Sequence, residues 1–354
     1  MPRYASSIDV ARLAGVSQSS VSRTYRSGAS VSAETRQKVL AAAEQLGYRP
    51  SMIPQIMLNH RSYFVALVIG GMYNPFYARA LEEFTIQLHA TGHQILLVHV
   101  DSGHSLDSVI PRLASYRVDA IVSALAVLSA EAAAALARFK IPVVSFNTPV
   151  KNEWVTSVSS DNKGAGAEIA DLFISRGARS FAYIAGPDGS PASEDRLKGF
   201  RDRLAARGYS GPQVAAGDFN YESGRQGLLS LLRERSPPEA IFCANDLLAI
   251  GAIDALRRLT SLRVPDDVLV AGFDDIAMAG WAAYDLTTFV QDAPQMVSET
   301  IRVLQTAEDA RAPLGEINLV LPAQLIERGS TQRGRRGWNR RTRDKSVDQR
   351  PISD

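Results

Sequence analysis

The sequence predicts a small all-helical N-terminal domain followed by a larger α/β core of two lobes. Three observations predict this division. The first fifty residues contain three short helical patterns, Pro50 and Pro54 then interrupt the chain, and beyond residue 61 short β-branched runs alternate with helical stretches. The chain has 354 residues, 45% of them hydrophobic and 21% charged, as in an ordinary globular protein. This length suggests two or three domains.

Serine, an effective helix N-cap, precedes each of the three N-terminal helices, and glycine follows them. These capping and terminating residues are, in order, Ser6 or Ser7, Gly15, Ser17, Gly28, Ser32 and Gly47. The second helix is expected from Gln18 to about Arg26, with Val21 and Tyr25 turned inward. A helix, a tight turn with glycine and a short helix that exposes polar side chains together form the helix-turn-helix pattern.

Short runs rich in β-branched and aromatic residues mark the strands of the core. They are residues 64–69, 95–100, 120–122, 142–146, 155–160, 181–185, 240–243 and 268–273. Because helical stretches separate these runs, we expect parallel sheets, in which the carboxyl ends of the strands meet at one edge and bind ligands there.

Polar side chains follow most of these strands or stand in the loops after them. They are Asn74, Asn147, Asp161, Asn162, Arg196, Asn245, Asp246, Asp274 and Asp275. Carboxylate, amide and guanidinium groups exchange hydrogen bonds with paired hydroxyls, and an aromatic side chain covers the apolar face of a ring. The set therefore favours a site for a sugar or another polyhydroxylated ring. The alternative for any one residue is a helix cap or a turn, which Asp and Asn also favour.

The net charge of +2 is unevenly distributed along the chain. Residues 1–60 carry a local charge of +4 and residues 330–354 a local charge of +5, whereas residues 61–329 carry −7. Basic ends on an acidic body indicate a polyanionic partner such as nucleic acid. The alternative is a solvated tail and a chance imbalance. Because the tail has almost no apolar periodicity, we expect it to be disordered.

The cysteine content and the absence of long apolar runs exclude several classes of protein. Cys243 is the sole cysteine, which excludes an internal disulfide and a multi-cysteine metal site. The sequence has no apolar run typical of a secretory signal or a membrane span, so we expect a cytoplasmic protein without a membrane partner.

Motifs for metals, nucleotides and catalysis were also considered and do not fit. His89 and His93 lie four residues apart, but Gly92 breaks the helix between them, so we expect no metal site. The segment Gly164-Ala165-Gly166 lacks the third glycine of a dinucleotide fingerprint. No catalytic motif is found either, and we expect no cofactor, no catalytic residue and no enzymatic activity.

A series of short motifs runs through residues 6–330. The N-terminal motifs are Ile8-Asp9-Val10-Ala11-Arg12-Leu13-Ala14-Gly15-Val16-Ser17, Val21-Ser22-Arg23, Val31-Ser32, Thr35-Arg36, Val39-Leu40 and Leu46-Gly47-Tyr48-Arg49-Pro50. Those of the core are Asn74-Pro75-Phe76-Tyr77, Arg196-Leu197-Lys198-Gly199-Phe200, Cys243-Ala244-Asn245-Asp246, Val264-Pro265-Asp266-Asp267-Val268, Gly272-Phe273-Asp274-Asp275 and Leu286-Thr287-Thr288. Together and in this order, these motifs resemble one family of bacterial transcription regulators, the lactose-repressor (LacI/GalR) family.

The resemblance implies a homodimeric regulator, most often a repressor, built from four segments. Residues 1–50 are a helix-turn-helix DNA-binding domain, 51–61 a hinge, 62–330 an effector-binding and dimerisation core resembling the type I periplasmic binding proteins, and 331–354 a basic tail that the family does not require. A dimer implies an inverted-repeat operator in double-stranded DNA.

The resemblance also implies the residues that contact DNA. They are Ser17, Gln18, Ser19, Arg23, Ser32, Thr35 and Met57. Those of the second helix face the major groove, where Arg23 suits the O6 and N7 of guanine, although a phosphate contact alone is the alternative. Ser32 and Thr35 contact phosphates.

The hinge departs from the family's Asn-x-x-Ala-Arg-x-Leu pattern, because residues 51–57 read Ser-Met-Ile-Pro-Gln-Ile-Met. Met57 takes the place of the leucine that enters the minor groove, and its apolar side chain can still separate two base pairs. Pro54 is harmless in a hinge helix that begins near Ile53 but strained in one that begins near Ser51.

A small-molecule effector, expected to be a sugar or sugar derivative, is implied as the partner of the core. Its binding residues are Asn74, Phe76, Phe146, Asp161, Arg196, Asn245, Asp274 and Trp281. Arg196 and Asp274 are expected to hold ring hydroxyls that the Asn245 and Asp161 side chains orient. The aromatic residues either stack on the ring or pack in the core.

Closure of the lobes on the effector is expected to change operator affinity. The sequence leaves open whether the effector is an inducer or a corepressor, whether the protein represses or activates, and whether dimers pair into tetramers. Two other classes share part of the pattern. A periplasmic solute-binding protein shares the two lobes but would lack a segment like residues 6–50. A sugar-processing enzyme shares the polar residues at the strand ends but would need a catalytic motif.

Overall fold

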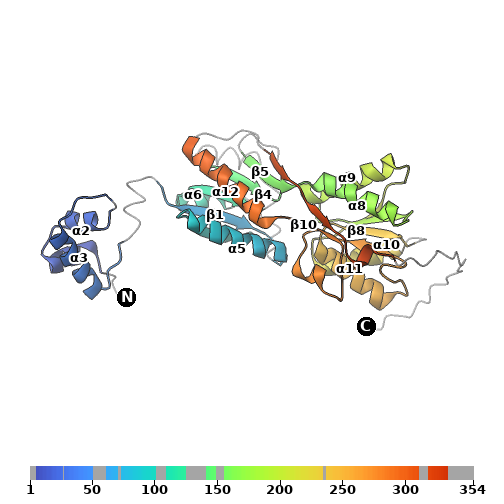
Figure 1. The fold of residues 1–354 in the computed structure, drawn as a ribbon, viewed down its shortest axis with the longest axis horizontal. Coiled ribbons are helices and arrows are strands. Elements are labelled where there is room, and N and C mark those ends of the chain that lie inside the picture. The colour runs from blue at the N-terminus through green and yellow to red at the C-terminus, as the bar shows by residue number, and fades with distance from the viewer. Residues whose placement is uncertain are drawn as a thin grey trace, which may run out of the picture. The chain divides into compact units, whose positions relative to one another are not determined.

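The computed structural model describes residues 5–26, 28–50, 61–70, 73–100, 109–124, 141–148, 155–233, 237–310 and 318–333. The chain divides into two compact units, Met1–Tyr63 and Phe64–Asp354 (Figure 1). The hinge residues Pro54 and Met57 and the tail beyond residue 333 lie outside the described residues.

The described residues of the first unit contain three helices. They are α1 (Ser7–Ala14), α2 (Gln18–Thr24) and α3 (Ala33–Gln45). Of the two candidate caps for α1, Ser6 is the cap: it forms a capping box with Asp9, and Gly15 ends the helix with a φ of 65°. The predicted helix-turn-helix arrangement is confirmed, although α2 ends at Thr24 rather than near Arg26.

A small apolar core holds these helices together. Val10, Val21 and Val39, one from each helix, are fully buried against one another. Tyr25 packs edge-on against Tyr48, with ring centroids 6.0 Å apart, and both rings lie against this core. The inward direction predicted for Val21 and Tyr25 is therefore confirmed, and the polar face of α2 remains exposed.

The first lobe of the second unit is a six-stranded sheet in which every pair of neighbouring strands is parallel. Its strands are β1 (Phe64–Ile69), β2 (Gln94–His99), β3 (Ala120–Ser123), β4 (Val143–Phe146), β5 (Val155–Ser160) and β11 (Asn318–Leu321). Their order across the sheet is β11-β5-β4-β3-β1-β2.

Successive side chains along these strands point to opposite faces of the first sheet, and both faces are buried. Val65, Leu67 and Ile69 of β1 pack with helices α5 (Pro75–Ala90) and α12 (Ala293–Ala310). Ala66 and Val68 of the same strand point the other way, towards α6 (Ile110–Ser115). The period of two follows from the pleat of the strand, and the result is a sheet with helices on both faces.

The second lobe is a four-stranded parallel sheet in the order β7-β6-β8-β9, with two pairs of helices. Its strands are β6 (Phe181–Ile184), β7 (Gln213–Ala215), β8 (Ala240–Cys243) and β9 (Leu269–Ala271). Its helices are α8 (Asn162–Ser175), α9 (Pro191–Ala206), α10 (Tyr221–Leu232), α11 (Asp246–Leu259) and the short 3-10 helices η2 (Ala277–Gly280) and η3 (Gly329–Thr331).

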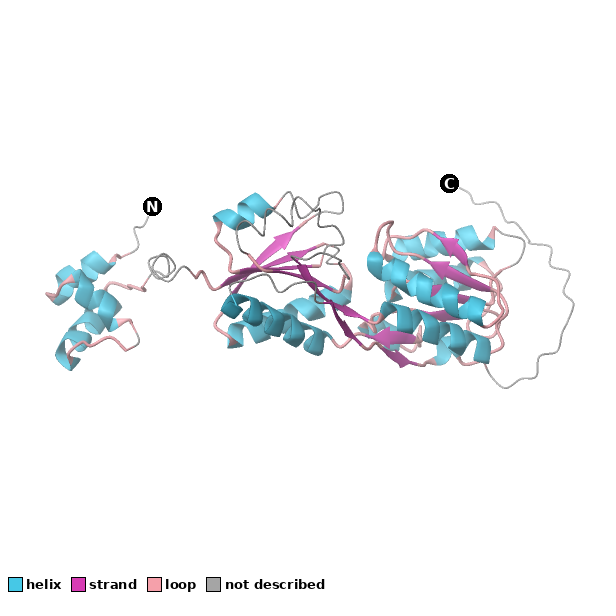
Figure 2. Cartoon of the chain, turned by 90° about the horizontal axis from the view of Figure 1, so that it is seen from above, coloured by secondary structure: helices cyan, strands magenta, loops and turns pink. Residues whose placement is uncertain are grey.

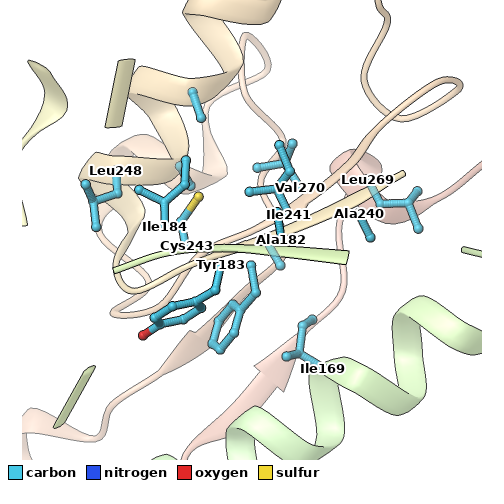
Figure 3. Close-up of a cluster of buried hydrophobic side chains, with 14 of the residues drawn as sticks. Ile169, Ala182, Tyr183, Ile184, Ala240, Ile241, Cys243, Leu248, Leu269 and Val270 are labelled. Atoms are coloured by element: carbon cyan, nitrogen blue, oxygen red, sulfur yellow. The ribbon is translucent and has the colours of Figure 1, made fainter. Parts of the chain in front are cut away.

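Figure 3 shows how this second sheet is buried on both faces. Tyr183 of β6 points to the side of the sheet that carries Ile169 of α8, whereas its neighbour Ile184 lies on the opposite side with Cys243 and Leu248. Burial of the Cys243 thiol raises its pKa, so this cysteine is an unreactive part of the core.

In the described residues the chain passes between the two lobes of the core at three places. It passes from β5 to α8, from β10 (Thr288–Val290) to α12, and from β11 to β12 (Gln324–Ile326). Strands β10 and β12 pair antiparallel, and Figure 2 shows strands running between the two α/β lobes. The predicted α/β core of two lobes is confirmed, but β7, β10, β11 and β12 were not predicted.

Candidate functional site

The exposed face of α2 carries the polar residues predicted to contact DNA. Gln18 donates from Nε2 to the Ser7 hydroxyl over 3.0 Å, and Arg23 donates from Nε to the Ser19 carbonyl oxygen over 3.3 Å. The Ser17 hydroxyl caps the helix and lies 2.8 Å from that of Ser19. The predicted residues of α2 and its cap, which are Ser17, Gln18, Ser19 and Arg23, are all exposed and can therefore meet a partner.

Ser7 links this face to the tyrosine pair of the first unit. Burial raises the pKa of Tyr48, and a hydrogen bond with the Ser7 hydroxyl partly opposes this rise. A hydroxyl group that donates to Tyr48 presents its oxygen to the Gln18 amide. Ser7 thereby fixes which end of the Gln18 amide faces outward, a role that the sequence did not reveal.

The two residues predicted to touch phosphates begin α3. Ser32 caps the helix by accepting from the Thr35 backbone N–H over 3.2 Å, and its hydroxyl donates to the Thr35 hydroxyl over 2.8 Å. A helix start of this kind offers unpaired N–H donors to an anion. The last of the predicted DNA contacts, Met57, lies outside the described residues.

A buried carboxylate, Asp274, lies where the two lobes meet. It follows β9 of the second lobe and is 6% exposed. Its Oδ2 accepts from Asn74 Nδ2 of the first lobe over 2.8 Å, and its Oδ1 accepts from Gln291 Nε2 over 2.6 Å. Gln291 in turn accepts from the Ser160 hydroxyl over 2.7 Å. Gln291 and Ser160 stand where the chain passes between the lobes, so a polar chain joins both lobes through Asp274.

Arg196 is the cation of this region and is 2% exposed. Its guanidinium carbon lies 3.5 Å from the centre of the Phe273 ring. Its Nε donates to Asn162 Oδ1 over 2.8 Å, and its Nη1 donates to the Ala244 carbonyl oxygen. No described hydrogen bond joins Arg196 to Asp274, so their opposite charges attract each other at longer range, without direct contact.

Burial has the largest effect on the pKa of Asp274. It raises the pKa of this carboxyl to about 6, against the opposing effects of the Arg196 charge and of the Asn74 and Gln291 amides. A second buried acid, Asp246, also has a raised pKa because of burial and of the Asp274 charge nearby. Asp246 is held by the Thr288 hydroxyl and the Ile276 backbone N–H, and both of its oxygens are used within the second lobe.

Three further polar groups point to an incomplete site in the same region. Asn147 Oδ1 and Asn162 Nδ2 are buried and have no hydrogen-bond partner among the described residues. Burial raises the pKa of the Tyr77 hydroxyl to about 12. The Asp274 charge adds to this rise, whereas a hydrogen bond with Asn147 and the Arg196 charge oppose it. Buried polar groups without partners are rare and call for a bound molecule or water. Tyr77 was not among the predicted residues, although it ends the motif that contains Asn74.

Two of the predicted effector residues serve instead as helix caps in this structure. Asn245 begins α11: its Oδ1 accepts from the Leu248 backbone N–H, and its Nδ2 donates to the Phe219 carbonyl oxygen. Asp161 is exposed and caps α8 by accepting from the Gly164 backbone N–H over 2.8 Å. For these two, the capping alternative describes the contacts that the structure contains.

The predicted aromatic residues divide into two groups. Phe76 and Phe146 are buried and stacked, with ring centroids 6.3 Å apart at 13°, and Phe146 also packs edge-on against Phe84. Phe146 and Tyr77 line a cavity of about 10 Å³ in the first lobe, room for about one water molecule. Trp281 follows η2 and is 55% exposed, and no described contact joins it to Asp274.

Within the part of the chain that the structure describes, no group of three or more His, Cys, Asp or Glu side chains could hold a metal ion. No helix among the described residues has the length and the apolar composition that crossing a membrane requires.

Two family profiles match the chain. The profile of bacterial regulatory proteins of the lacI family matches residues 8–51, and that of a periplasmic binding protein-like domain matches residues 170–331. The HTH-type transcriptional regulator CelR of Thermobifida fusca is 33% identical, over 91% of this chain and 96% of the relative. The HTH-type transcriptional regulator DegA of Bacillus subtilis is 30% identical, over 91% and 97%. The ribose operon repressor of Halalkalibacterium halodurans is 29% identical, over 94% and 98%.

Solved structures show the same fold. A lac repressor dimer bound to operator and the anti-inducer ONPF matches with a TM-score of 0.84 and 24% identity, over 93% of this chain and 99% of that one. A complex of the transcriptional regulator CelR with cellobiose matches with a TM-score of 0.70 and 32% identity, over 92% and 99%.

These comparisons decide the class of protein. The matched relatives are transcriptional regulators, which confirms the prediction of a DNA-binding regulator rather than an enzyme. The predicted combination of a helix-turn-helix domain with a periplasmic-binding-protein-like core is also confirmed. The chain belongs to the lacI family of bacterial regulatory proteins.

Proposed function

We propose that this protein is a homodimeric repressor that binds an inverted-repeat operator and that a polyhydroxylated effector of the sugar class controls its operator affinity. In this proposal residues 1–50 bind DNA, 51–61 form the hinge, 62–330 bind the effector and dimerise, and 331–354 are an accessory basic tail. Two relatives support the DNA-binding and effector-binding parts: the lac repressor was solved as a dimer on its operator, and CelR was solved with cellobiose. Because the partner is operator DNA, we place the protein in the cytoplasm.

The exposed polar face of α2 supports the DNA half of the proposal. Gln18 and Ser19 project from the first turn of α2 and Arg23 from its last turn. A recognition helix reads base edges in the major groove with residues of this kind, and each well-formed bidentate contact discriminates by about 1–3 kcal/mol. Ser17, Ser32 and Thr35 position the domain on phosphates, and Met57 enters the minor groove.

The buried polar region around Asp274 is the single observation that carries the effector half. A carboxylate, a guanidinium stacked on an aromatic ring and two unpartnered amide groups lie together at the junction of the lobes. Vicinal hydroxyls satisfy such groups, because each hydroxyl both donates and accepts. Arg196 and Asp274 hold the ring hydroxyls, and Asn147 and Asn162 complete their hydrogen bonds on the bound molecule.

The aromatic and capping residues have more restricted roles in this proposal. Phe76 and Phe146 form the apolar wall beside the ring. Asn245 and Asp161 hold the N-termini of α11 and α8 in place by capping them. Once the lobes rearrange, their side chains reach the hydroxyl groups of the effector. Trp281, exposed at the end of η2, contributes to a surface of the core and contacts no effector.

Repression and activation share all of these features. An activator would use the same DNA-binding domain and the same effector site, and the position of the operator relative to the promoter separates the two. We favour repression because the relatives named as repressors, such as the ribose operon repressor of Halalkalibacterium halodurans, match this chain over nearly its whole length.

Calorimetric titration of the full chain with a panel of sugars, including cellobiose, ribose and their reduced alcohols, tests the effector half. At least one sugar is expected to bind one molecule per chain, and Asp274→Ala is expected to abolish the heat of binding. Asp202→Ala, which removes an exposed carboxylate paired with Lys198 on α9, is the matched control and should bind as the wild type does. Binding that survives in Asp274→Ala would place the effector elsewhere.

A further inference from the structure

A direct hydrogen bond joins two side chains of the two lobes that lie 200 residues apart in the sequence. A second contact between the lobes runs from the Tyr73 hydroxyl to the Asp218 carbonyl oxygen over 3.3 Å. Asn74 belongs to the first lobe, at the start of α5, and Asp274 belongs to the second lobe, after β9. We propose that the Asn74–Asp274 hydrogen bond is a latch that closes the ligand-free protein, and that the effector binds by replacing the Asn74 amide on Asp274 with one of its own hydroxyl groups. The second half rests on the effector site proposed above.

Asn74 is held in place by its own helix. Its Oδ1 accepts from the Phe76 backbone N–H over 3.0 Å and caps α5. The cap fixes the orientation of the amide, so Nδ2 is directed at Asp274 Oδ2, 2.8 Å away. One side chain therefore has two separable roles, since the oxygen caps the helix and the nitrogen reaches the other lobe.

The latch leaves no room for a ligand while it is closed. Asn74 and Asp274 are each 6% exposed, and Gln291 is 1% exposed. Both carboxylate oxygens of Asp274 are already occupied, one by each amide. A sugar reaches this carboxylate only after the lobes separate, and it must then supply the hydrogen bond that Asn74 gave up.

Of the two amides on Asp274, Asn74 is the one that breaks. Gln291 follows β10 on the connecting segment that continues into α12 of the first lobe, and it is bonded at its other end to Ser160. It stays with the hinge region as the lobes move, whereas Asn74 moves with α5 of the first lobe. The latch thus rests on a single bond to a charged acceptor, which is stronger than a bond between neutral groups.

The charged groups that face Asp274 give the latch a dependence on pH. They are the cation Arg196 of α9, the phenol Tyr77 of α5 and the carboxyl Asp246 of α11. The closed lobes bury Asp274 and raise its pKa to about 6, and separation returns it to water and to an ordinary pKa. The closed form therefore binds a proton more readily, and lower pH favours closure.

Two substitutions separate the latch from the cap. Asn74→Ser retains a good helix cap but is too short to reach Asp274. Asn74→Asp also caps the helix but places a second carboxylate next to that of Asp274.

The distance between the lobes is measured in the full chain by electron spin resonance between spin labels at Ala90→Cys on α5 and Ala205→Cys on α9, both exposed positions. Cys243 is fully buried and stays unlabelled, and dilution with unlabelled chain leaves one labelled copy per dimer.

Without any sugar, the wild type is expected to show one narrow distance distribution. The ratio of open to closed lobes should rise about tenfold in Asn74→Ser, as the loss of one hydrogen bond to a charged group requires. Asn74→Asp should open further at pH 8 and close again as the pH is lowered to 5. Identical distributions for wild type and Asn74→Ser would overturn the latch, whatever the protein does with sugars.

Sugar titration tests the replacement step separately. A sugar that binds the wild type in the calorimetric panel is expected to bind Asn74→Ser about tenfold more tightly, because a competing closed form lowers apparent affinity by its population. Weaker binding to Asn74→Ser would make Asn74 a ligand of the effector and overturn the replacement. If no sugar in the panel binds, the proposed effector class fails, and the ligand-free distances still decide the latch.

Discussion

Gly166 of α8 lies directly against Arg196 of α9. A β-carbon added to Gly166 would stand 2.2 Å from the Arg196 backbone oxygen, and one added to Gly199 would stand 2.0 Å from the Lys163 backbone oxygen. The two helices therefore touch backbone to backbone through glycine. This contact sets the position of Arg196 at the Phe273 ring, and it explains Gly166 without any nucleotide. Gly164 instead lies against the Asp161 side chain that caps α8.

Gly166→Ala is expected to destabilise the protein by about 1–3 kcal/mol, because the new methyl group forces α8 and α9 apart. Thermal unfolding of the full chain measures this. Gly211→Ala is the matched control, since its added carbon would meet only the Arg201 side chain at 3.7 Å. Equal melting temperatures for the two variants would contradict the close packing described here.

Arg196→Lys is expected to weaken sugar binding at least tenfold while the chain stays folded. The lysine ammonium lacks the planar fork that donates to both Asn162 and Ala244 and that stacks on Phe273. Calorimetry with the sugar that binds the wild type measures the loss. Arg203→Lys, at a partly exposed position of the same helix paired with Asp171, should bind normally, and a similar loss there would show that the effect is not local.

Arg23→Ala is expected to remove selective DNA binding and to leave weak binding that salt abolishes. Fluorescence anisotropy with a selected duplex and a scrambled duplex, at two salt concentrations, measures selectivity. Arg12→Ala removes the same charge from α1, where Arg12 pairs with Asp9, and should retain selectivity. Selectivity that persists in Arg23→Ala would limit Arg23 to a phosphate contact.

Ser7→Ala is expected to relax the base preference at one position of each half-site. The Ser7 hydroxyl engages Gln18 Nε2, so Gln18 presents its oxygen outward and favours a base with a donor, adenine through N6 or cytosine through N4. Selection from a random duplex library with wild type, Ser7→Ala and Gln18→Ala checks this. The two variants should relax the same position, and different positions would refute the coupling between these side chains.

The wild type is expected to lose stability, relative to Asp274→Asn, as the pH rises through about 6. Burial raises the Asp274 pKa above its unfolded value, so its contribution to stability is fully present below a pH of about 4 and is lost through about 6. The shift corresponds to at most about 3 kcal/mol. Melting temperatures of both proteins are measured at pH 5 and pH 8. The wild type should fall further below Asp274→Asn at pH 8 than at pH 5, and an equal difference at both pH values would contradict ionisation of the buried carboxylate.

The strands were the most predictable part of the fold. Phe64–Ile69 and Ala240–Cys243 were predicted with the bounds that the structure has, because both faces of a parallel strand are buried and its apolar run is continuous. Strands β10 and β12 were missed. Each has three residues in a segment between the lobes, and a run this short carries no periodic signal.

The site was predictable in part. Arg196, Asp274 and Asn74 were predicted, and the structure brings them to one region because the ends of parallel strands face the junction of the lobes. Gln291 and Ser160 were not, because they contact Asp274 only through the arrangement of the connecting segments, which no local pattern encodes. Asp161 and Asn245 show the converse, since the residue types that bind hydroxyls also cap helices.

Selection of DNA by the full chain, with and without sugar, tests the central claim most directly. A random duplex library is incubated with the purified protein, and retained duplexes are sequenced. An inverted repeat is expected to be enriched, and its retention should change severalfold when a sugar that binds the protein is added. Enrichment of no sequence under either condition, or a repeat whose retention is unaffected by every sugar that binds, would contradict an effector-controlled regulator.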